Sequence, residues 1–117
     1  MKHFKSHEFT CKCGCGANKM DIFFMSRLDV AREIAGVPFR ITSGYRCFKH
    51  NESIDGASKD STHMKGHAAD IEVRNSHERF RVLDALLRVG FKRIGMSYNF
   101  IHVDDCESKV QDVVWMY

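Results

Sequence analysis

The sequence predicts an α+β fold, with a small antiparallel sheet and helices packed on one of its faces. Two segments place apolar residues at helical spacing, and five short segments are rich in β-branched and aromatic residues. These helices and strands do not alternate strictly along the chain, which disfavours a parallel sheet with crossover helices. The length of 117 residues and the hydrophobic fraction of 44% suit a single folded domain spanning residues 1–117.

Both predicted helices have recognisable ends. The first begins after Asp21, a good N-cap residue, and runs to about residue 35, before the breaking sequence 36–38. The second begins at residue 75 or 76 and ends at Gly90. The residues expected to face the core are Phe24, Leu28, Ala31 and Ala35 in the first helix and Phe80, Leu83, Leu86 and Leu87 in the second.

The predicted strands cover residues 39–42, 68–73, 93–96, 100–104 and 113–116. Residues 44–67 differ in character, because they are rich in Gly, Ser, Asn, Asp, His and Lys and contain few apolar side chains. A loop of this length inside a compact domain is uncommon and usually functional. We therefore expect the chemistry of the protein to lie in and around this segment.

Charge and hydropathy exclude several classes of protein. The longest apolar runs are too short to span a bilayer, so no membrane span is expected. The N-terminal residues are basic but lack an apolar core segment, which predicts synthesis in the cytoplasm without a signal peptide. The net charge of +3 is spread along the chain and forms no basic stripe, so we expect no nucleic-acid partner. A monomer is the expected state.

Five cysteines are an odd number, so they cannot all pair within one chain, and a reducing compartment favours thiols. Cys11, Cys13 and Cys15 form a CxCxC pattern whose sulfurs can share one side of an extended segment. The spacing differs from the CxxC of common zinc modules, so a thiolate metal site and a packed turn of small residues both remain open. Cys47 and Cys106 are isolated in the sequence, and burial as small apolar groups is the simplest interpretation.

Three polar residues stand out against apolar or small neighbours. His102 lies between Ile101 and Val103 in a predicted strand, and Asp70 follows two alanines in another. With His63 they provide two imidazoles and a carboxylate, which is a ligand set that leaves one zinc coordination position open for water. Taken alone, each histidine could equally be a hydrogen-bonded or surface residue, and Asp70 a turn carboxylate.

A longer pattern includes these residues. It consists of three ordered motifs, Ser43-Gly44-Tyr45-Arg46, then Ser61-x-His63-x-x-Gly66-x-Ala68-x-Asp70, then Ile101-His102-Val103-Asp104. The pattern resembles the zinc D-Ala-D-Ala carboxypeptidase and phage endolysin family of peptidoglycan peptidases, whose fold is shared with the hedgehog signalling domain. The resemblance runs from about residue 9 to residue 115. It implies one zinc ion held by His63, Asp70 and His102, with Arg46 and Ser61 contacting the substrate or the transition state.

The general base is harder to assign. The position three residues before the last ligand, acidic or histidine in many relatives, is Asn99 here, and an amide does not accept a proton usefully. Asp104 lies two residues after His102, so in a strand it shares the face of that ligand and is a candidate base. Orientation of a histidine ligand is the equally open alternative for Asp104. His67 and His50 are further candidates.

We therefore expect a zinc peptidase that cleaves amide bonds in the peptide stems or cross-links of peptidoglycan, as a carboxypeptidase or an endopeptidase. A phage or prophage lysin that reaches the cell wall after lysis or release fits this expectation. A non-catalytic, zinc-binding hedgehog-like module in adhesion or virion structure is the alternative, prompted by Asn99. A thiol redox or metal-sensing protein that uses the CxCxC pattern is a third hypothesis.

Overall fold

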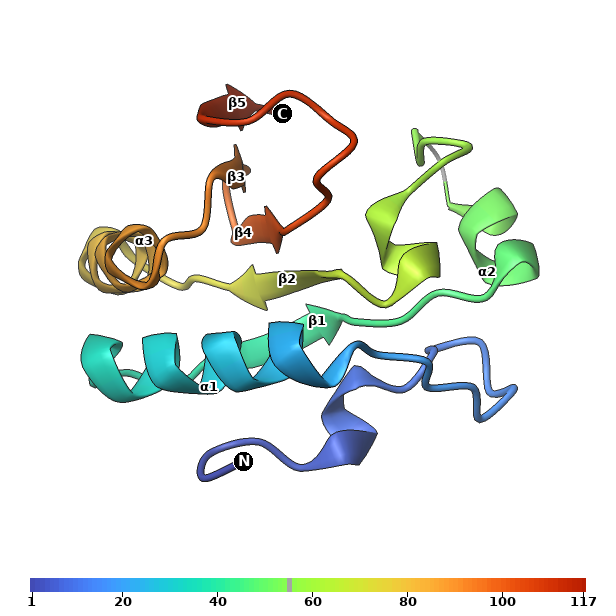
Figure 1. Cartoon of the computed structure of the whole chain (residues 1–117), viewed down its shortest axis with the longest axis horizontal. Helices are drawn as coiled ribbons and strands as arrows, with labels where there is room; N and C mark the ends of the chain where they lie inside the picture. The colour runs from blue at the N-terminus through green and yellow to red at the C-terminus, as the bar shows by residue number, and fades with distance from the viewer. Residues whose placement is uncertain (55) are drawn as a thin grey trace.

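The computed structural model describes residues 1–54 and 56–117 and contains one five-stranded sheet in the order β1-β2-β4-β3-β5 (Figure 1). The strands are β1 (Arg40–Ser43), β2 (Ala68–Glu72), β3 (Arg93–Met96), β4 (Phe100–Asp104) and β5 (Val113–Met116). All neighbours pair antiparallel except β3 and β5, which run parallel. The predicted α+β class is confirmed, but the last strand pairs parallel, and the first two strands differ from their predicted ranges, 39–42 and 68–73, by one residue at one end or both.

Two long helices pack together and cover one face of this sheet. They are α1 (Ile22–Ala35) and α3 (Ser76–Val89). Asp21 caps α1 by accepting a hydrogen bond from the backbone N–H of Phe24 at 2.9 Å. Asn75 does the same for α3 through the N–H of Glu78 at 2.8 Å. The N-terminal ends of both helices therefore follow the capping pattern in the sequence.

The alternation of side chains along β2 and β4 divides the sheet into an apolar face and a polar face. Ile71 and Ile101 lie in the hydrophobic core under the helices and are fully buried. Asp70 and His102 are one residue away from them in the same strands, so they point to the opposite face. The helices thus form the core on one side, and the other side of the sheet is free to build a site.

The prediction for the inner face of α1 is confirmed, since its four expected core residues are buried. In α3 the prediction is partly wrong. Phe80 and Leu87 are 64% and 50% exposed, whereas Val82, Ala85 and Leu86 are the buried residues. The period of the helix aligns these three positions with the core, and the side chains at 80 and 87 fall outside that stripe.

The segment 44–67, expected to be a loop, contains two short helices, with Asp55 outside the described residues. They are α2 (Phe48–Ser53) and the 3-10 helix η2 (Thr62–Lys65). A further 3-10 helix, η1 (Ser6–Phe9), lies near the N-terminus. Figure 1 shows α2 and η2 gathered at the end of β2 that is opposite α3. The segment therefore packs against one end of the sheet.

The cysteines differ from expectation at one position. Cys106 is buried, as predicted, but Cys47 is half-buried and its sulfur lies 3.8 Å from that of Cys11 and 3.7 Å from that of Cys13. The interpretation of Cys47 as an isolated apolar residue is wrong. The fold brings it to the CxCxC segment, a contact between residues more than 30 positions apart that spacing alone does not reveal.

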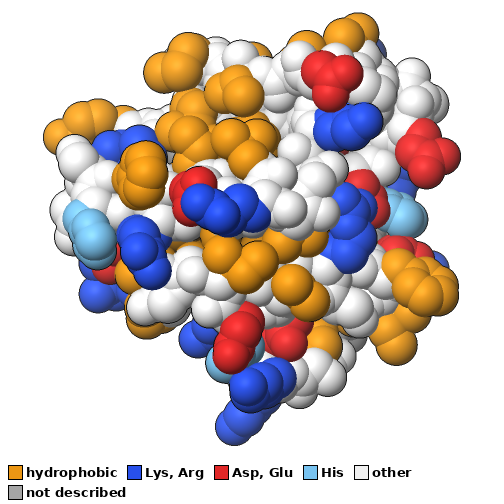
Figure 2. All heavy atoms as spheres, turned by 60° about the vertical axis from the view of Figure 1, so that its left-hand side comes forward, with side chains coloured by type: hydrophobic (Ala, Val, Ile, Leu, Met, Phe, Trp, Pro, Cys, Tyr) orange, Lys and Arg blue, Asp and Glu red, His pale blue; other side chains and the backbone are white. Residues whose placement is uncertain are grey.

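The surface shows both signs of charge. On the face in Figure 2, Lys and Arg side chains are interspersed with Asp and Glu, and hydrophobic side chains gather toward the top of the view. Across residues 1–54 and 56–117, no helix combines the length and the apolar character that crossing a membrane requires.

Candidate active site

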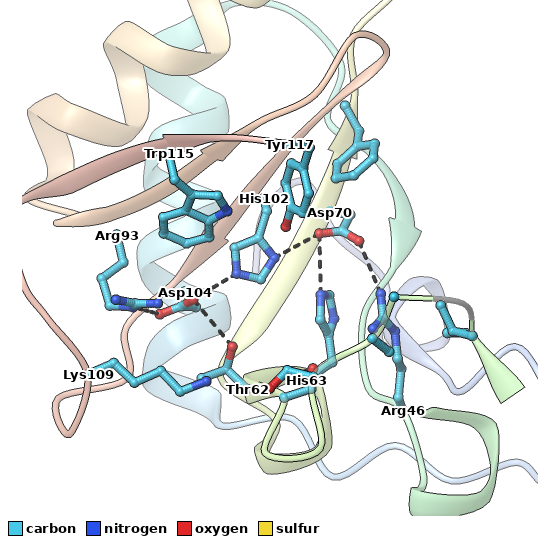
Figure 3. A pocket seen from close by; sticks show the side chains of 16 residues that line it. Arg46, Thr62, His63, Asp70, Arg93, His102, Asp104, Lys109, Trp115 and Tyr117 are labelled. Atoms are coloured by element: carbon cyan, nitrogen blue, oxygen red, sulfur yellow. Dashed lines mark hydrogen bonds and ion pairs between the residues drawn. The ribbon is translucent and has the colours of Figure 1, made fainter. Parts of the chain in front are cut away.

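Two neighbouring strands bring Asp70 and His102 together on the polar face of the sheet. The two residues are direct partners in the β2–β4 register, and Asp70 Oδ1 lies 2.9 Å from His102 Nδ1. Directly opposed residues in an antiparallel pair have adjacent side chains, so the register alone fixes this contact. Figure 3 shows Asp70 at the centre of the group, with His102, His63 and Arg46 directed toward its carboxylate.

His63 reaches the same carboxylate from η2. Ser61 caps η2 by accepting a hydrogen bond from the backbone N–H of His63 at 3.2 Å. Gly66 ends it in a left-handed conformation, where an added Cβ would lie only 1.9 Å from the carbonyl oxygen of Lys19. The turn is thus packed tightly against the chain before α1. It places His63 Nε2 at 3.3 Å from Asp70 Oδ1.

The hydrogen-bond partners of the two imidazoles restrict which ring nitrogen carries the proton. His63 Nδ1 lies 2.8 Å from the carbonyl oxygen of Gly44, which can only accept, so Nδ1 is the donor. His102 lies between two carboxylates, with Nε2 at 2.7 Å from Asp104 Oδ2 and Nδ1 at 2.9 Å from Asp70 Oδ1, so either nitrogen can donate. When the ring is neutral and its proton is on Nε2, His63 Nε2 and His102 Nδ1 both direct lone pairs toward Asp70 Oδ1.

Three lone-pair atoms therefore converge on one point in a buried environment. His63, Asp70 and His102 are 3%, 7% and 5% exposed, and their ligand atoms lie within 4.8 Å of one another. Converging acceptors repel unless a cation or added protons lie between them. The donor set of two imidazoles and a carboxylate suits zinc, so these residues fit the predicted ion.

The pKa shifts of Asp70 and His102 also indicate that positive charge is favoured at this point. Burial acts to raise the pKa of Asp70, but hydrogen bonds with His102 and His63 hold it well below its usual range. Burial acts to lower the pKa of His102, but the carboxylates of Asp104 and Asp70 together raise it. The carboxylates are thus ionised and attract a cation or a proton to this point.

Arg46 binds the other oxygen of Asp70. Its Nη2 lies 3.3 Å from Asp70 Oδ2, whereas both histidines face Oδ1. Its Nε donates to Ser43 Oγ at 2.9 Å, and its Nη1 to Asn51 Oδ1 at 3.4 Å. The guanidinium is thus held by three acceptors, and it fixes the orientation of the carboxylate.

Asp104 lies behind His102, and each of its carboxylate oxygens accepts two hydrogen bonds. Its Oδ1 accepts from Arg93 Nε at 2.7 Å and from the backbone N–H of Cys106 at 3.2 Å. Its Oδ2 accepts from His102 and, at 3.3 Å, from the hydroxyl of Thr62. Burial opposes ionisation, yet these donors, His102 first, lower the pKa of Asp104 to about 2. With only 1% exposure, its carboxylate favours orientation of the imidazole over proton transfer.

A cavity of about 640 Å³ opens above this group. Its walls include residues that the sequence reasoning did not place at the site, namely Arg93, Lys109, Trp115 and Tyr117. The ring of Trp115 lies 5.4 Å from that of His102, and the guanidinium of Arg93 stacks over Trp115 at 5.0 Å. For Trp115 and Tyr117 the sequence does contain a signal, because residues two positions apart in an extended strand lie on the same face.

The remaining predicted residues divide into two groups. Ser61 lines the cavity besides capping η2. The alternative base candidates, His67 and His50, do not line the cavity. His67 Nδ1 pairs with Asp105 Oδ1 at 2.8 Å, and the backbone N–H of His50 contacts the sulfur of Cys47. Asn99 lines a different hollow near the start of α3.

A buried His-Asp-His group below an open cavity is the arrangement of a metal-dependent hydrolase. A family model described as Peptidase M15 matches residues 2–104, nearly the whole chain. The protein therefore belongs to the Peptidase M15 family, the zinc D-Ala-D-Ala carboxypeptidase family that its motifs resemble. A comparison with curated proteins gave no match.

Proposed function

We propose that this peptidase uses one zinc ion to hydrolyse amide bonds in the peptide stems or cross-links of peptidoglycan, as a carboxypeptidase or an endopeptidase. Membership of the Peptidase M15 family supports the peptide substrate. The observation that carries the metal is the convergence of His63 Nε2, His102 Nδ1 and Asp70 Oδ1, three buried lone-pair atoms at the floor of the cavity. The resemblance to phage endolysins supports action on the cell wall after lysis or release by one monomeric domain.

His63, Asp70 and His102 would hold the ion, with the open side of the cavity available to the substrate. When bound, zinc supplies Lewis-acid chemistry, which polarises a scissile carbonyl and makes water more acidic. Asp104 keeps the proton of His102 on Nε2, so that Nδ1 stays free as a ligand atom. The carbonyl of Gly44 fixes the tautomer of His63 in the same way.

Arg46 has two roles in this proposal. Its contact with Asp70 Oδ2 orients the ligand carboxylate, and its place in the cavity wall presents a permanent cation to the substrate. A guanidinium there stabilises either an oxyanion or a substrate carboxylate by charge-assisted hydrogen bonds. Ser61 is proposed to contact the substrate backbone from the same wall.

Tyr117 lies on the other side of the cavity. Its ring packs 5.2 Å from that of Phe100, and Figure 3 shows its hydroxyl directed toward the His102–Asp70 pair. Burial and the Asp70 carboxylate raise the pKa of Tyr117, so the phenol stays protonated at neutral pH. It is therefore a hydrogen-bond donor available to the substrate.

The test combines metal analysis with product analysis. Purified protein should release new amino groups from peptidoglycan, and chelation should abolish this release and lower the melting temperature. His63→Ala, Asp70→Ala and His102→Ala should each lose activity together with bound zinc. His77→Ala removes an exposed imidazole of α3 that belongs to no candidate metal-binding group among the described residues, so it should retain both activity and zinc. Unchanged zinc content in all three site variants would refute the ligand assignment.

The non-catalytic alternative is supported by a specific observation. Asp104 accepts four hydrogen bonds and Asn99 lies outside the cavity, so neither is a free proton acceptor there. A hedgehog-like module for adhesion or virion structure would bind zinc through the same three residues without hydrolysis. Zinc-loaded protein that binds peptidoglycan but releases no amino groups would favour this function.

A further inference from the structure

Four cysteines form a second cluster, distinct in its residues from the proposed zinc site. Cys11, Cys13 and Cys15 come from the segment after η1, and Cys47 precedes α2. Their four sulfur atoms all lie within 4.8 Å of one another. The fifth cysteine, Cys106, contacts Ser108 instead, at 3.3 Å. The arrangement thus separates four cysteines from one, which accounts for the odd number in the sequence.

The CxCGCG segment forms a turn in which Cys11 is buried and Cys13 and Cys15 are exposed. Gly14 and Gly16 have φ values of +90° and +77°, in the region that favours glycine. An added Cβ at either would meet no atom within 4 Å, so conformation and not space explains these two glycines. A hydrogen bond of 2.8 Å from the N–H of Cys11 to the carbonyl of Ala17 closes the loop. The loop wraps three sulfurs around one centre.

The sulfur separations match a tetrahedral metal site. Cys11 Sγ and Cys13 Sγ are 3.5 Å apart, and Cys47 Sγ lies 3.8 Å and 3.7 Å from them. A tetrahedron with Zn–S bonds of about 2.3 Å has S···S edges of about 3.8 Å. The same separations are far longer than a disulfide bond of about 2.05 Å. Packing of small apolar side chains gives no reason for three sulfurs to lie 3.5–3.8 Å from one another.

Backbone N–H groups contact three of the four sulfurs. The N–H of Cys47 contacts the sulfur of Cys11 at 3.4 Å, and that of His50 contacts the sulfur of Cys47 at 3.4 Å. The N–H of Ala17 contacts the sulfur of Cys15 at 3.5 Å. Hydrogen bonds to the charged form of an acid stabilise that form, and such contacts orient metal ligands. The sulfurs of Cys11, Cys15 and Cys47 therefore each have a backbone donor that would orient them as metal ligands.

We propose that Cys11, Cys13, Cys15 and Cys47 bind one zinc ion in a closed, structural site. Four protein ligands leave no position for a substrate, so this ion would stabilise the fold and take no part in hydrolysis. The proposal does not depend on the function proposed above.

The cluster lies next to the segment that carries Arg46, so an ion bound there would affect the active site. Cys47 directly follows Arg46, the residue that orients Asp70. The N–H of Tyr45 already donates to the carbonyl of Phe9 at 2.9 Å, so the N-terminal segment and the Arg46 segment are neighbours. A metal that joins Cys47 to the CxCxC loop would anchor the Arg46 segment to the N-terminal segment. The site would thus hold the wall of the catalytic cavity in place.

Metal stoichiometry tests the proposal. Protein purified under reducing conditions with zinc, then freed of excess metal, should contain about two zinc ions per chain. Cys13→Ser and Cys47→Ser should each lose about one of them, and His102→Ala should lose about one as well while keeping the thiolate site. Cys106→Ser is the matched control, because it removes a thiol outside the cluster and should retain both ions.

Cobalt substitution gives a second, spectroscopic readout. Co²⁺ bound by thiolates has sulfur-to-metal charge-transfer absorption, which should be present in the wild-type protein and in His102→Ala but lost in Cys13→Ser. Wild-type protein with about one zinc ion and no thiolate–cobalt absorption would overturn the proposal. So would an intact mass of the non-reduced protein showing that these cysteines are joined as disulfides.

Discussion

Replacement of Asp104 by asparagine tests how the site is held together. The carboxylate accepts from Arg93 and Cys106 N–H through Oδ1 and from His102 and Thr62 through Oδ2. An asparagine has one oxygen and one NH₂ group, so it can satisfy only one of these two pairs. If the amide oxygen faces Arg93, the NH₂ group faces His102 Nε2, which must then accept.

That change would move the proton of His102 to Nδ1, the nitrogen directed at Asp70. A protonated Nδ1 cannot bind a metal, so Asp104→Asn should weaken zinc binding by about 10- to 100-fold. Arg93 keeps a neutral acceptor in this arrangement but loses its buried negative charge, which should lower the free energy of unfolding by about 3 kcal/mol. Excess zinc should restore activity, because the variant retains all three ligands.

The assay is a chelator competition that measures zinc affinity, followed by activity at saturating zinc. Asp105→Asn is the matched control, because Asp105 is the next residue but pairs with His67 and Arg27 at the surface. The Asp105→Asn variant should bind zinc with wild-type affinity. A variant Asp104→Asn that binds zinc with wild-type affinity yet loses about 100-fold in turnover would refute the orienting role and support a general base.

Three further predictions address other parts of the structure. Arg46→Lys should retain zinc yet lose about tenfold or more in turnover, because an ammonium cannot bind three acceptors in one plane; equal turnover would remove Arg46 from the site. Tyr117→Phe should raise KM for a peptide substrate about fivefold through loss of one neutral hydrogen bond, and an unchanged KM would exclude that contact. The third prediction concerns Asp29. Burial acts to raise the pKa of this carboxyl group, but hydrogen bonds from the backbone N–H groups of Lys2 and His3 lower it. The stability that Asp29 adds should therefore be present above about pH 4 and lost as the pH falls through its folded-state pKa. Asp29→Ala should unfold about 1 kcal/mol more easily at pH 7 and show no difference in strong acid, and a difference independent of pH would contradict the assignment.

The sequence predicted those features that depend on local patterns. Caps and breakers placed the ends of α1 and α3, and alternation placed β3, β4 and β5. The motifs placed His63, Asp70 and His102 in one group, and the structure brings them together. Features that depend on contacts between distant segments were missed. The parallel pairing of β5 with β3 and the approach of Cys47 to Cys11 are of this kind.

The misplaced residues of α3 have a related cause. Phe80 and Leu87 are apolar, but which stripe of a helix faces the core depends on where the helix sits on the sheet. The same holds for Asp104, whose strand position made a base and an orienting group equally reasonable. Its depth behind His102, and the guanidinium of Arg93 on its other side, favour the orienting role.

The parallel last strand has a practical consequence for anyone who purifies this protein. The N–H of Tyr117 bonds to the carbonyl of Met96 at 3.0 Å, which holds the final described residue at the wall of the cavity. A polyhistidine tag fused after Tyr117 would begin there, and its imidazoles would compete for the same metal as His63 and His102. Met1 is exposed and lies beyond the β1 edge of the sheet, whereas the C-terminus lies at the β5 edge (Figure 1). An affinity tag therefore belongs at the N-terminus, and zinc measurements on protein tagged at the other end would count ions that the tag itself recruits.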